Sequence, residues 1–268
     1  LRRLREAMGG QVEFVVSGGA PLSRDLGLFF HGARMSILEG YGLTETTAPV
    51  CVNSPSRLRI GTVGVPLPGV EVRIADDGEV LVRGGNVFRG YHGNEEATAE
   101  DFDGDWFRTG DLGTLDDDGF LTLHDRKKEI VVTASGKNVA PTPLEERMTA
   151  HDLVAQAMIV GDRRKFVAAL VTLDDAELQA FAERRGLEGG PDELRRHELV
   201  RKEVQRAVHH ANDAVSRAES VREFVILDRE FTEDAGELTP TLKLRRHDIA
   251  QHFSQEIESI YGEGQARN

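Results

Sequence analysis

Four short motifs, which follow one another in a fixed order, constrain this chain more than any other feature of its sequence. They occupy residues 41–46 (YGLTET), 109–111 (TGD), 125–130 (DRKKEI) and 238–243 (LTPTLK). Each motif alone predicts little, because glycine, threonine and charged residues are also typical of ordinary turns and solvated loops. The order of the four motifs is therefore what carries information about the fold.

Length and charge narrow the class of protein. The chain has 268 residues, which is enough for two domains with a sizeable core. Lysine and arginine total 33 against 46 aspartates and glutamates, which gives a formal net charge of −13. Because a chain of this charge repels phosphate backbones, we expect no nucleic-acid partner.

The cysteine content and the apolar runs bear on the cellular compartment. Cys51 is the only cysteine, so neither an internal disulfide nor a zinc site built from several thiolates can form, which fits a reducing cytoplasm. No apolar run approaches the roughly 20 residues that span a bilayer. The arginines of residues 1–10 are not followed by an apolar segment, so these residues are not a signal peptide. We expect a cytoplasmic protein without a transmembrane segment, and peripheral membrane contact stays open.

The beginning of the chain predicts a strand–turn–helix–strand unit, which is typical of an α/β layer. Residues 12–17 (VEFVVS) are an apolar run that leads into a glycine pair, and residues 35–39 are a second short strand. Between them, Ser23 is the expected N-cap of a helix, because apolar residues follow it at helical spacing. From residue 61 to residue 125 the pattern changes to short β runs joined by Asp-Gly turns, which are hairpin signals.

The domain boundary is expected at residues 125–128, and a smaller α+β unit follows it. A long helix is expected to begin at Pro191 and to carry a stripe of apolar residues as far as Val215. The other expected elements are a helix near residues 143–149 and strands at residues 157–160, 167–173 and 222–227. A last amphipathic helix carries Ile249, Phe253, Ile257 and Ile260, and residues 262–268 are expected to fray.

In this order, the four motifs resemble those of the adenylate-forming, or AMP-binding, superfamily, whose members activate carboxylic acids with ATP. Residues 136–141 (GKNVAP), taken with residues 240–243 (PTLK), narrow the resemblance to long-chain fatty acyl-CoA synthetases. The resemblance implies a fatty acid as the substrate, with ATP, Mg²⁺ and CoA. It also implies the reaction, in which acyl-AMP forms first and the acyl group then passes to CoA.

The resemblance further implies an α/β plus α+β architecture. Residues 1–126 are expected to form the end of a large N-terminal domain, with an α/β layer and a small β-barrel-like subdomain. Residues 127–268 are expected to form a smaller, mobile α+β C-terminal domain. The family also has a phosphate loop upstream, rich in serine, threonine and glycine, and no such stretch occurs in this sequence. We therefore expect a C-terminal fragment of the enzyme that is inactive by itself.

For the nucleotide, the resemblance assigns residues in the first half of the chain. Tyr41 offers an aromatic face to adenine, and Thr44 offers a hydroxyl to a phosphate oxygen. Glu45 offers a carboxylate to Mg²⁺, which prefers one or two such ligands together with phosphates. The other expected contacts around the adenine are Gly19 and Ala20, and Gly42 is a further expected nucleotide-binding residue. Without the resemblance, residues 41–46 are equally well interpreted as a loop with a capping threonine and a solvated glutamate.

Charged residues further along the chain complete the expected site. The resemblance gives Asp111 the ribose role and Arg126 a ribose or phosphate contact, to which a planar guanidinium is suited. Lys128 matches the hinge about which the smaller domain swings between two half-reactions. Lys243 would bridge the substrate carboxylate and the α-phosphate. Ser135, Gly136 and Lys137 resemble the loop that the family brings to the site for thioester formation.

Two other functions stay open. One is a ligase that stops at acyl-AMP or loads a carrier protein, and the other is a non-catalytic module that binds nucleotide or CoA. Residues 136–141 and a helical insertion at residues 174–220 favour the CoA-forming enzyme. No base or orienting acid lies near Cys51 in the sequence, so we interpret it as a packing residue rather than a nucleophile.

Overall fold

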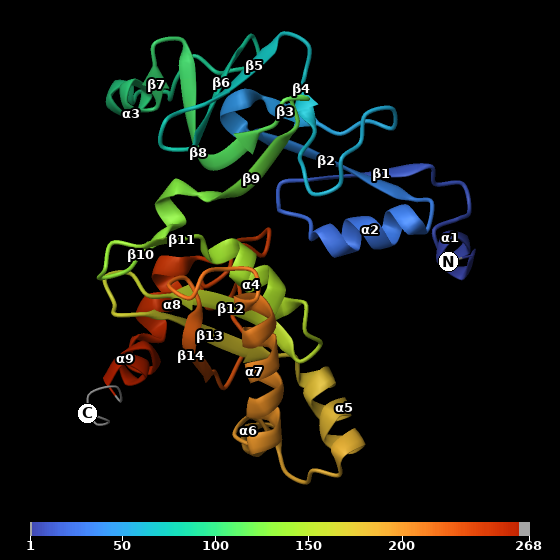
Figure 1. Ribbon diagram of the computed structural model, residues 1–268, viewed down its shortest axis with the longest axis vertical. Coiled ribbons are helices and arrows are strands. Elements are labelled where there is room, and N and C mark those ends of the chain that lie inside the picture. Colours follow the sequence, from blue (N-terminus) through green and yellow to red (C-terminus); the bar gives the residue numbers. More distant parts are fainter. Residues whose placement is uncertain (1, 263–268) are drawn as a thin grey trace. The chain divides into compact units, whose positions relative to one another are not determined.

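The computed structural model describes residues 2–262 and divides the chain into two compact units, Leu1–Lys128 and Glu129–Asn268 (Figure 1). The boundary between these units lies two residues after the one expected at residue 126. The assignment of the two units to a large domain and a mobile small domain stays a prediction. The expected frayed end lies, apart from Gly262, outside the described residues.

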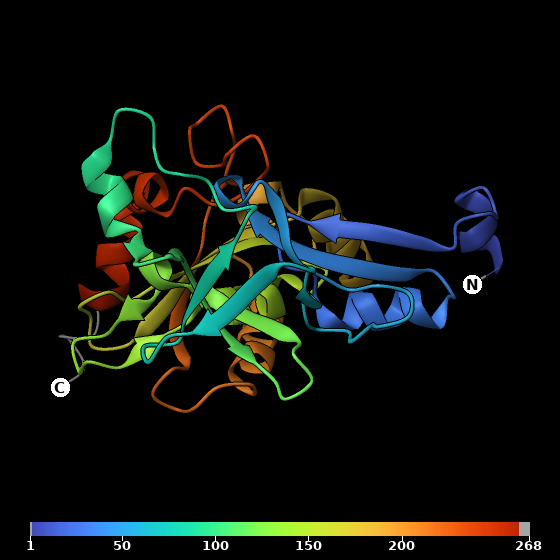
Figure 2. The same cartoon turned by 90° about the horizontal axis from the view of Figure 1, so that it is seen from above.

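The first unit begins with a short helix, α1 (Arg2–Ala7), and a four-stranded sheet in the order β1-β2-β3-β4. Strands β1 (Phe14–Gly18) and β2 (Ser36–Leu43) are parallel, and α2 (Arg24–Gly32) connects them and lies along the pair (Figure 2). The predicted N-cap is confirmed, because the hydroxyl of Ser23 accepts the N–H of Leu26. Strands β3 (Ala48–Val52) and β4 (Val65–Pro66) complete the sheet in antiparallel pairing.

Strand β2 is longer than the sequence predicts, and this correction bears on the site. The expected strand ends before Gly40, whereas the observed strand runs through Tyr41 and pairs it with Cys51. A tight connection makes the extension possible, because Ala48 adopts a left-handed φ of 80°. A Cβ on Gly42 would lie 2.1 Å from the carbonyl oxygen of Ala48, so only glycine permits this close approach.

The second sheet of this unit is antiparallel and five-stranded, in the order β5-β6-β8-β7, and β9 pairs with the second half of β8. Both predicted hairpin turns are present, with Gly78 and Gly119 at positive φ. A shared core joins the two sheets, since Tyr41 and Cys51 pack against Val80 and Leu121. The elements are β5 (Val70–Ile74), β6 (Glu79–Gly84), α3 (Glu95–Glu100), β7 (Phe102–Asp103), β8 (Trp106–Leu115) and β9 (Leu121–Arg126).

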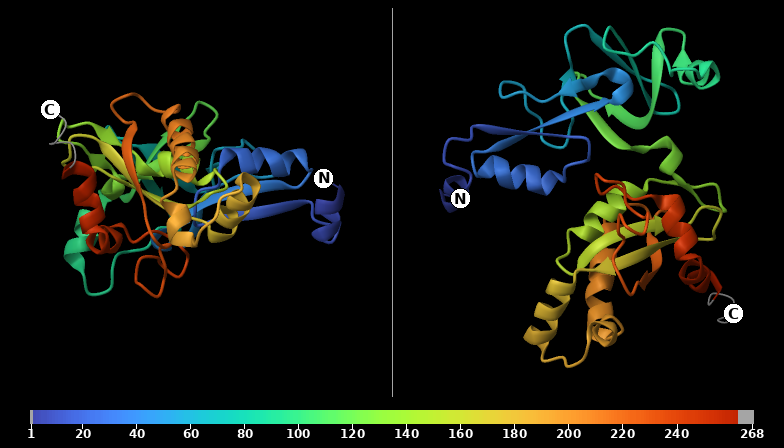
Figure 3. Two further views of the ribbon diagram at one scale, coloured as in Figure 1. Left: turned by 90° about the horizontal axis from the view of Figure 1, so that it is seen from below. Right: turned by 180° about the vertical axis from the view of Figure 1, so that it is seen from behind.

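The second unit is built on a three-stranded sheet with helices on both faces (Figure 3). Its central strand β13 (Val167–Leu173) is buried throughout, and pairs antiparallel with β12 (Val154–Val160) and parallel with β14 (Val221–Ile226). Alternate residues of β12 and β13 therefore enter two separate cores. One core includes α4 (Pro141–Thr149), α5 (Asp175–Arg185) and α7 (Glu198–Asn212), and the other includes α8 (Arg246–His252) and α9 (Ser254–Gly262).

Two predicted long helices are each divided in the structure. The helix expected from Pro191 ends at Arg195 as α6 (Pro191–Arg195), and α7 starts anew because the ring nitrogen of His197 accepts the N–H of Leu199 at 3.1 Å. Val215 lies beyond the end of α7, although it still packs at the edge of the core. The last helix is likewise interrupted at Phe253, between α8 and α9.

Three small elements lie near the boundary between the units. A single 3₁₀ turn, η2 (Lys127–Glu129), follows β9, and the short strands β10 (Val131–Val132) and β11 (Asn138–Val139) form an antiparallel pair. The predicted mixture of α/β and α+β layers is confirmed. Among residues 2–262, no helix combines the length and the apolar character needed to cross a bilayer.

Candidate functional site

The TGD motif forms a bulge in strand β8. Residues 109–111 lie opposite the single residue Val80 of β6, so three residues face one. Gly110 has a φ of 71°, which favours glycine. The hydroxyl of Thr109 accepts the N–H of Asp111 at 3.1 Å and donates to the carbonyl of Val80 at 2.8 Å. Thr109 and Gly110 therefore shape the bulge, and the bulge sets the direction of Asp111.

Asp111 brings two other predicted residues together. The residue is 5% exposed, and its carboxylate accepts the phenol proton of Tyr41 at 2.5 Å and lies 3.1 Å from Nε of Arg126. Arg126 stands directly opposite Asp111 on β9, so the contact follows from strand pairing. Burial, and then the negative charge of Asp111, raise the pKa of Tyr41. Tyr41 is therefore a permanent donor, and the three side chains form one cluster.

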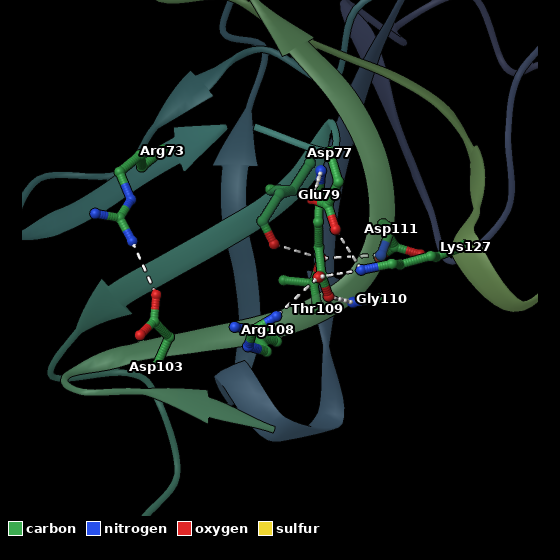
Figure 4. A network of polar contacts seen from close by, with 10 residues as sticks. Arg73, Asp77, Glu79, Asp103, Arg108, Thr109, Gly110, Asp111 and Lys127 are labelled. Atoms are coloured by element: carbon green, nitrogen blue, oxygen red, sulfur yellow. Dashed lines mark hydrogen bonds and ion pairs between the residues drawn. The ribbon is translucent and has the colours of Figure 1, made fainter. Parts of the chain in front are cut away.

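A buried glutamate that sequence reasoning missed supports this cluster (Figure 4). Glu79, which is 4% exposed, accepts the N–H of Gly110 at 3.0 Å and the ammonium group of Lys127 at 3.0 Å. Asp77 accepts the same ammonium group at 2.5 Å. These hydrogen bonds raise the pKa of Lys127 and lower that of Asp77. In the sequence Glu79 only follows an Asp-Gly turn, and nothing there signals its burial.

Glu45 lies in a 3₁₀ turn, η1 (Thr44–Thr46), that follows β2. One oxygen of its carboxylate lies 3.2 Å from the hydroxyl of Tyr91, which also lies 3.0 Å from Asp101. Because a phenol has one proton, Tyr91 donates to one of these carboxylates at a time. The capping threonine is Thr46, whose hydroxyl accepts the N–H of Leu43, whereas Thr44 is exposed.

The glycine turn after β1 lies at the same edge of the sheet as Tyr41. Gly18 pairs with Gly40 in the parallel ladder, so the turn at Gly19 and Ala20 leaves the sheet where Tyr41 follows in β2. Gly19 has a φ of 82°, and both residues of the turn are exposed. Ligands of open α/β sheets commonly bind at the carboxyl ends of parallel strands.

In the second unit, the predicted thioester loop is the turn between β10 and β11. Gly136 has a φ of 78°, and the N–H of Lys137 binds the hydroxyl of Thr133 at 3.2 Å. The hydroxyl of Ser135 lies 3.0 Å from the same oxygen. The ammonium group of Lys137 lies 3.2 Å from Glu219, at the end of the helical insertion. The loop is thus held by Thr133, with one cation at its tip.

Lys243 lies on a separate, tightly closed loop of the second unit. Its N–H binds the hydroxyl of Thr239 at 3.0 Å, and its carbonyl accepts the N–H of Thr239 at 2.9 Å. Leu242, with a φ of 59°, makes the turn. The side chain of Lys243 is exposed, and among residues 2–262 none forms a hydrogen bond or ion pair with its ammonium group.

A buried carboxylate supports the start of this loop. Glu237 is fully buried and binds Arg229 through two hydrogen bonds of 2.6 and 2.7 Å. Nδ1 of His252 lies 3.0 Å from the same carboxylate. Burial alone would raise the pKa of Glu237, but the hydrogen bonds from Arg229 and His252 lower it to about 2. Glu237 therefore stays ionised and fixes the chain that leads into the loop.

Two further sequence predictions can be placed. Lys128 is the last residue of the first unit and is exposed. Cys51 is fully buried, and burial raises the pKa of its thiol to about 12. A thiol of this kind does not form the reactive thiolate, which agrees with a packing role.

Comparison with known proteins assigns the family. Residues 2–92 match the AMP-binding enzyme family, and residues 128–265 match the AMP-binding enzyme C-terminal domain. The chain belongs to the AMP-binding enzyme family. The resemblance drawn from the four motifs is thereby confirmed.

Similar members of the AMP-binding enzyme family include bacterial and mammalian proteins. The chain is 52% identical over 262 residues to the long-chain-fatty-acid–CoA ligase FadD15 of Mycobacterium tuberculosis, with 97% of this chain and 44% of the relative covered. It is 33% identical over 289 residues to the human long-chain-fatty-acid–CoA ligase ACSBG1, with 98% and 40% covered. The chain thus spans less than half the length of these relatives.

Solved structures of the same fold carry adenine nucleotides. The A domain of the carboxylic acid reductase of Segniliparus rugosus, in complex with AMP, has a TM-score of 0.78 at 24% identity, with 97% of this chain and 41% of that chain covered. The o-succinylbenzoate CoA synthetase of Bacillus subtilis, in complex with ATP and magnesium, has a TM-score of 0.66 at 23% identity, with 92% and 49% covered. At these identities the likeness concerns the fold.

Proposed function

We propose that this AMP-binding chain is part of an AMP-forming fatty acid–CoA ligase. In the first step, the fatty acid carboxylate attacks the α-phosphate of ATP, which forms acyl-AMP and releases pyrophosphate. In the second step, the thiol of CoA attacks the acyl carbonyl and AMP leaves. The identity of 52% to a long-chain-fatty-acid–CoA ligase supports this reaction. The observation that carries the proposal is the cluster of Tyr41, Asp111 and Arg126.

The cluster has the chemistry expected of a ribose site. Tyr41 and Arg126 contact different oxygens of the Asp111 carboxylate, and a carboxylate is an acceptor-only group that suits the two hydroxyls of a ribose. The side chain of Arg126 is 54% exposed, and its Nε lies on the Oδ1 side of that carboxylate. We propose that the ribose hydroxyls bind Asp111 on this side, while Arg126 turns toward a phosphate oxygen. Tyr41 then serves as the fixed donor that keeps Asp111 in place.

Magnesium would be held by Glu45 together with the phosphates of ATP. Within residues 2–262 there is no group of three or more histidine, cysteine, aspartate or glutamate side chains that could hold a metal ion. A single carboxylate fits Mg²⁺ all the same, because this ion commonly binds one or two carboxylates and completes its shell with phosphates and water. When bound, the ion would neutralise phosphate charge. Tyr91 would orient the Glu45 carboxylate through their contact at 3.2 Å.

The second unit would supply one cation to each step. We propose that Lys243 acts in acyl-AMP formation, where its ammonium group stabilises charge shared by the carboxylate and the α-phosphate. In this proposal, Ser135, Gly136 and Lys137 act in thioester formation, and Lys128 is the hinge between the two arrangements. An exposed cation on a tight loop, like that of Lys243, is suited to a task that brings it to a substrate and removes it again.

Radiolabelled fatty acid separates this function from the alternatives. The complete gene product that contains these residues is incubated first with ATP and then with CoA, and the products are resolved by chromatography. Label in acyl-CoA supports the ligase. Label that stops at acyl-AMP indicates a ligase that serves another acceptor, such as a carrier protein. Nucleotide binding without either product indicates a non-catalytic module. The predicted cytoplasmic location is not tested by this assay and stays a prediction.

A further inference from the structure

Three consecutive residues at the unit boundary differ sharply in how they are held. The first of them, Lys127, is anchored to the first unit. Its ammonium group binds Asp77 at 2.5 Å and the buried Glu79 at 3.0 Å (Figure 4). Glu79 also holds the bulge at Gly110, so Lys127 is fixed to the same structure that carries Asp111.

The third residue, Glu129, is anchored to the second unit. Its carboxylate binds Nε of Arg246 at 2.9 Å. Arg246 is itself 22% exposed and makes two hydrogen bonds of 2.6 and 2.8 Å with Glu145, whose carboxylate also accepts the N–H of Ile159. Although burial opposes the charge, the carboxylates of Glu145 and Glu129 raise the pKa of Arg246, so this anchor stays charged.

The residue between the two anchors is different. The side chain of Lys128 is exposed, and no residue in the described part of the chain forms a hydrogen bond or ion pair with it. We propose that Lys127 and Glu129 are positioning residues that confine the hinge motion to the backbone of Lys128. This inference rests on the proposed function, in which the second unit changes its orientation between the two half-reactions.

The anchors explain how a short hinge can stay accurate. When both neighbours are fixed, the φ and ψ angles of one residue take up most of the rotation, so few orientations of the second unit are accessible. Arg246 follows Lys243 by three positions, and it contacts Glu129 directly. The second anchor therefore also fixes the start of the unit to the segment that carries Lys243.

A suppressor experiment in the complete gene product tests the proposal. Lys128→Pro restricts the proposed pivot and should slow the transfer of preformed acyl-AMP to CoA. Adding Glu129→Ala releases one anchor, so neighbouring residues can take up the rotation. We expect the double variant to regain transfer by at least about tenfold, which corresponds to ~1.4 kcal/mol in a barrier. Glu129 suits this test because its removal leaves both bonds between Arg246 and Glu145 intact.

A matched control removes an ion pair elsewhere. Lys202 binds Glu198 at 2.6 Å on the exposed face of α7, so Lys128→Pro with Lys202→Ala should regain nothing. A merely structural role of Glu129 would lower transfer further rather than restore it. Equal recovery in both double variants, or none in either, would overturn the proposal. So would normal transfer in Lys128→Pro alone, whereas the absence of acyl-CoA in the unaltered protein would refute the proposed function instead. Thermal unfolding of each variant verifies that it is folded.

Discussion

The contact between Tyr41 and Asp111 predicts a measurable coupling in stability. In Asp111→Ala, the buried hydroxyl of Tyr41 loses its acceptor, and an unsatisfied buried donor costs about 1–3 kcal/mol. The ion pair with Arg126 adds at most about 1 kcal/mol, because that side chain is 54% exposed and therefore screened. We expect a total loss of about 1–4 kcal/mol in the free energy of unfolding of the first unit. Asp111→Asn should lose less, since an amide oxygen still accepts the phenol proton.

Urea unfolding followed by fluorescence measures this loss selectively. Trp106 is the only tryptophan and lies on β8, the strand that carries Asp111, so its emission reports the first unit. A double-mutant cycle with Tyr41→Phe isolates the contact from other effects of each substitution. The expected coupling energy is about 1 kcal/mol or more. If the two substitutions are additive, the hydrogen bond contributes nothing, and the role of Tyr41 as the donor that fixes Asp111 is refuted.

Three other predictions concern the second unit and the single cysteine. In the complete gene product, Lys243→Ala should reduce acyl-AMP formation by at least about 10²-fold but leave thioester formation from preformed acyl-AMP intact. An equal fall in the rates of both steps would contradict a step-specific role of Lys243. Because the pKa of buried Glu237 is about 2 against an ordinary 4.5, this residue stabilises the folded state above pH 4.5, and the stabilisation is lost as pH falls toward 2. The loss is roughly 3 kcal/mol, so Glu237→Gln should flatten the acid limb of a plot of the unfolding midpoint against pH. Cys51 should react with iodoacetamide at least about tenfold faster in urea than in the native chain, since its thiol is buried and seldom ionised; equal rates would contradict its burial.

The sequence correctly predicted helix caps and hairpin turns, because these features depend on a few adjacent residues. The hydroxyl of Ser23 caps α2, and the Asp-Gly turns at Gly78 and Gly119 close hairpins. Boundaries failed where tertiary contacts overrode such signals. Strand β2 continues through two glycines because β3 pairs with it, and the ring of His197 starts a new helix inside an apolar stripe that looks continuous.

In the candidate site, too, the sequence did not predict contacts between residues that lie far apart in the chain. The motifs led to Asp111 and Arg126, and strand pairing sets these two side chains opposite each other. Glu79 and Tyr91 were missed, because each depends on a partner far away in the chain. Glu79 binds the N–H of Gly110, 31 positions later, and Tyr91 contacts Glu45, 46 positions earlier. A sequence without an alignment gives no signal for such pairs.

The charged run at residues 125–130 shows what a structure adds to a motif. In the sequence, this run is compatible with either a solvated linker or a hinge, because both tolerate charge at a domain boundary. In the structure three of its charges have separate partners: Arg126 binds Asp111, Lys127 binds Glu79, and Glu129 binds Arg246. A linker would leave these charges in water. Their distribution, with partners in one unit before Lys128 and in the other after it, instead supports the proposed hinge at Lys128.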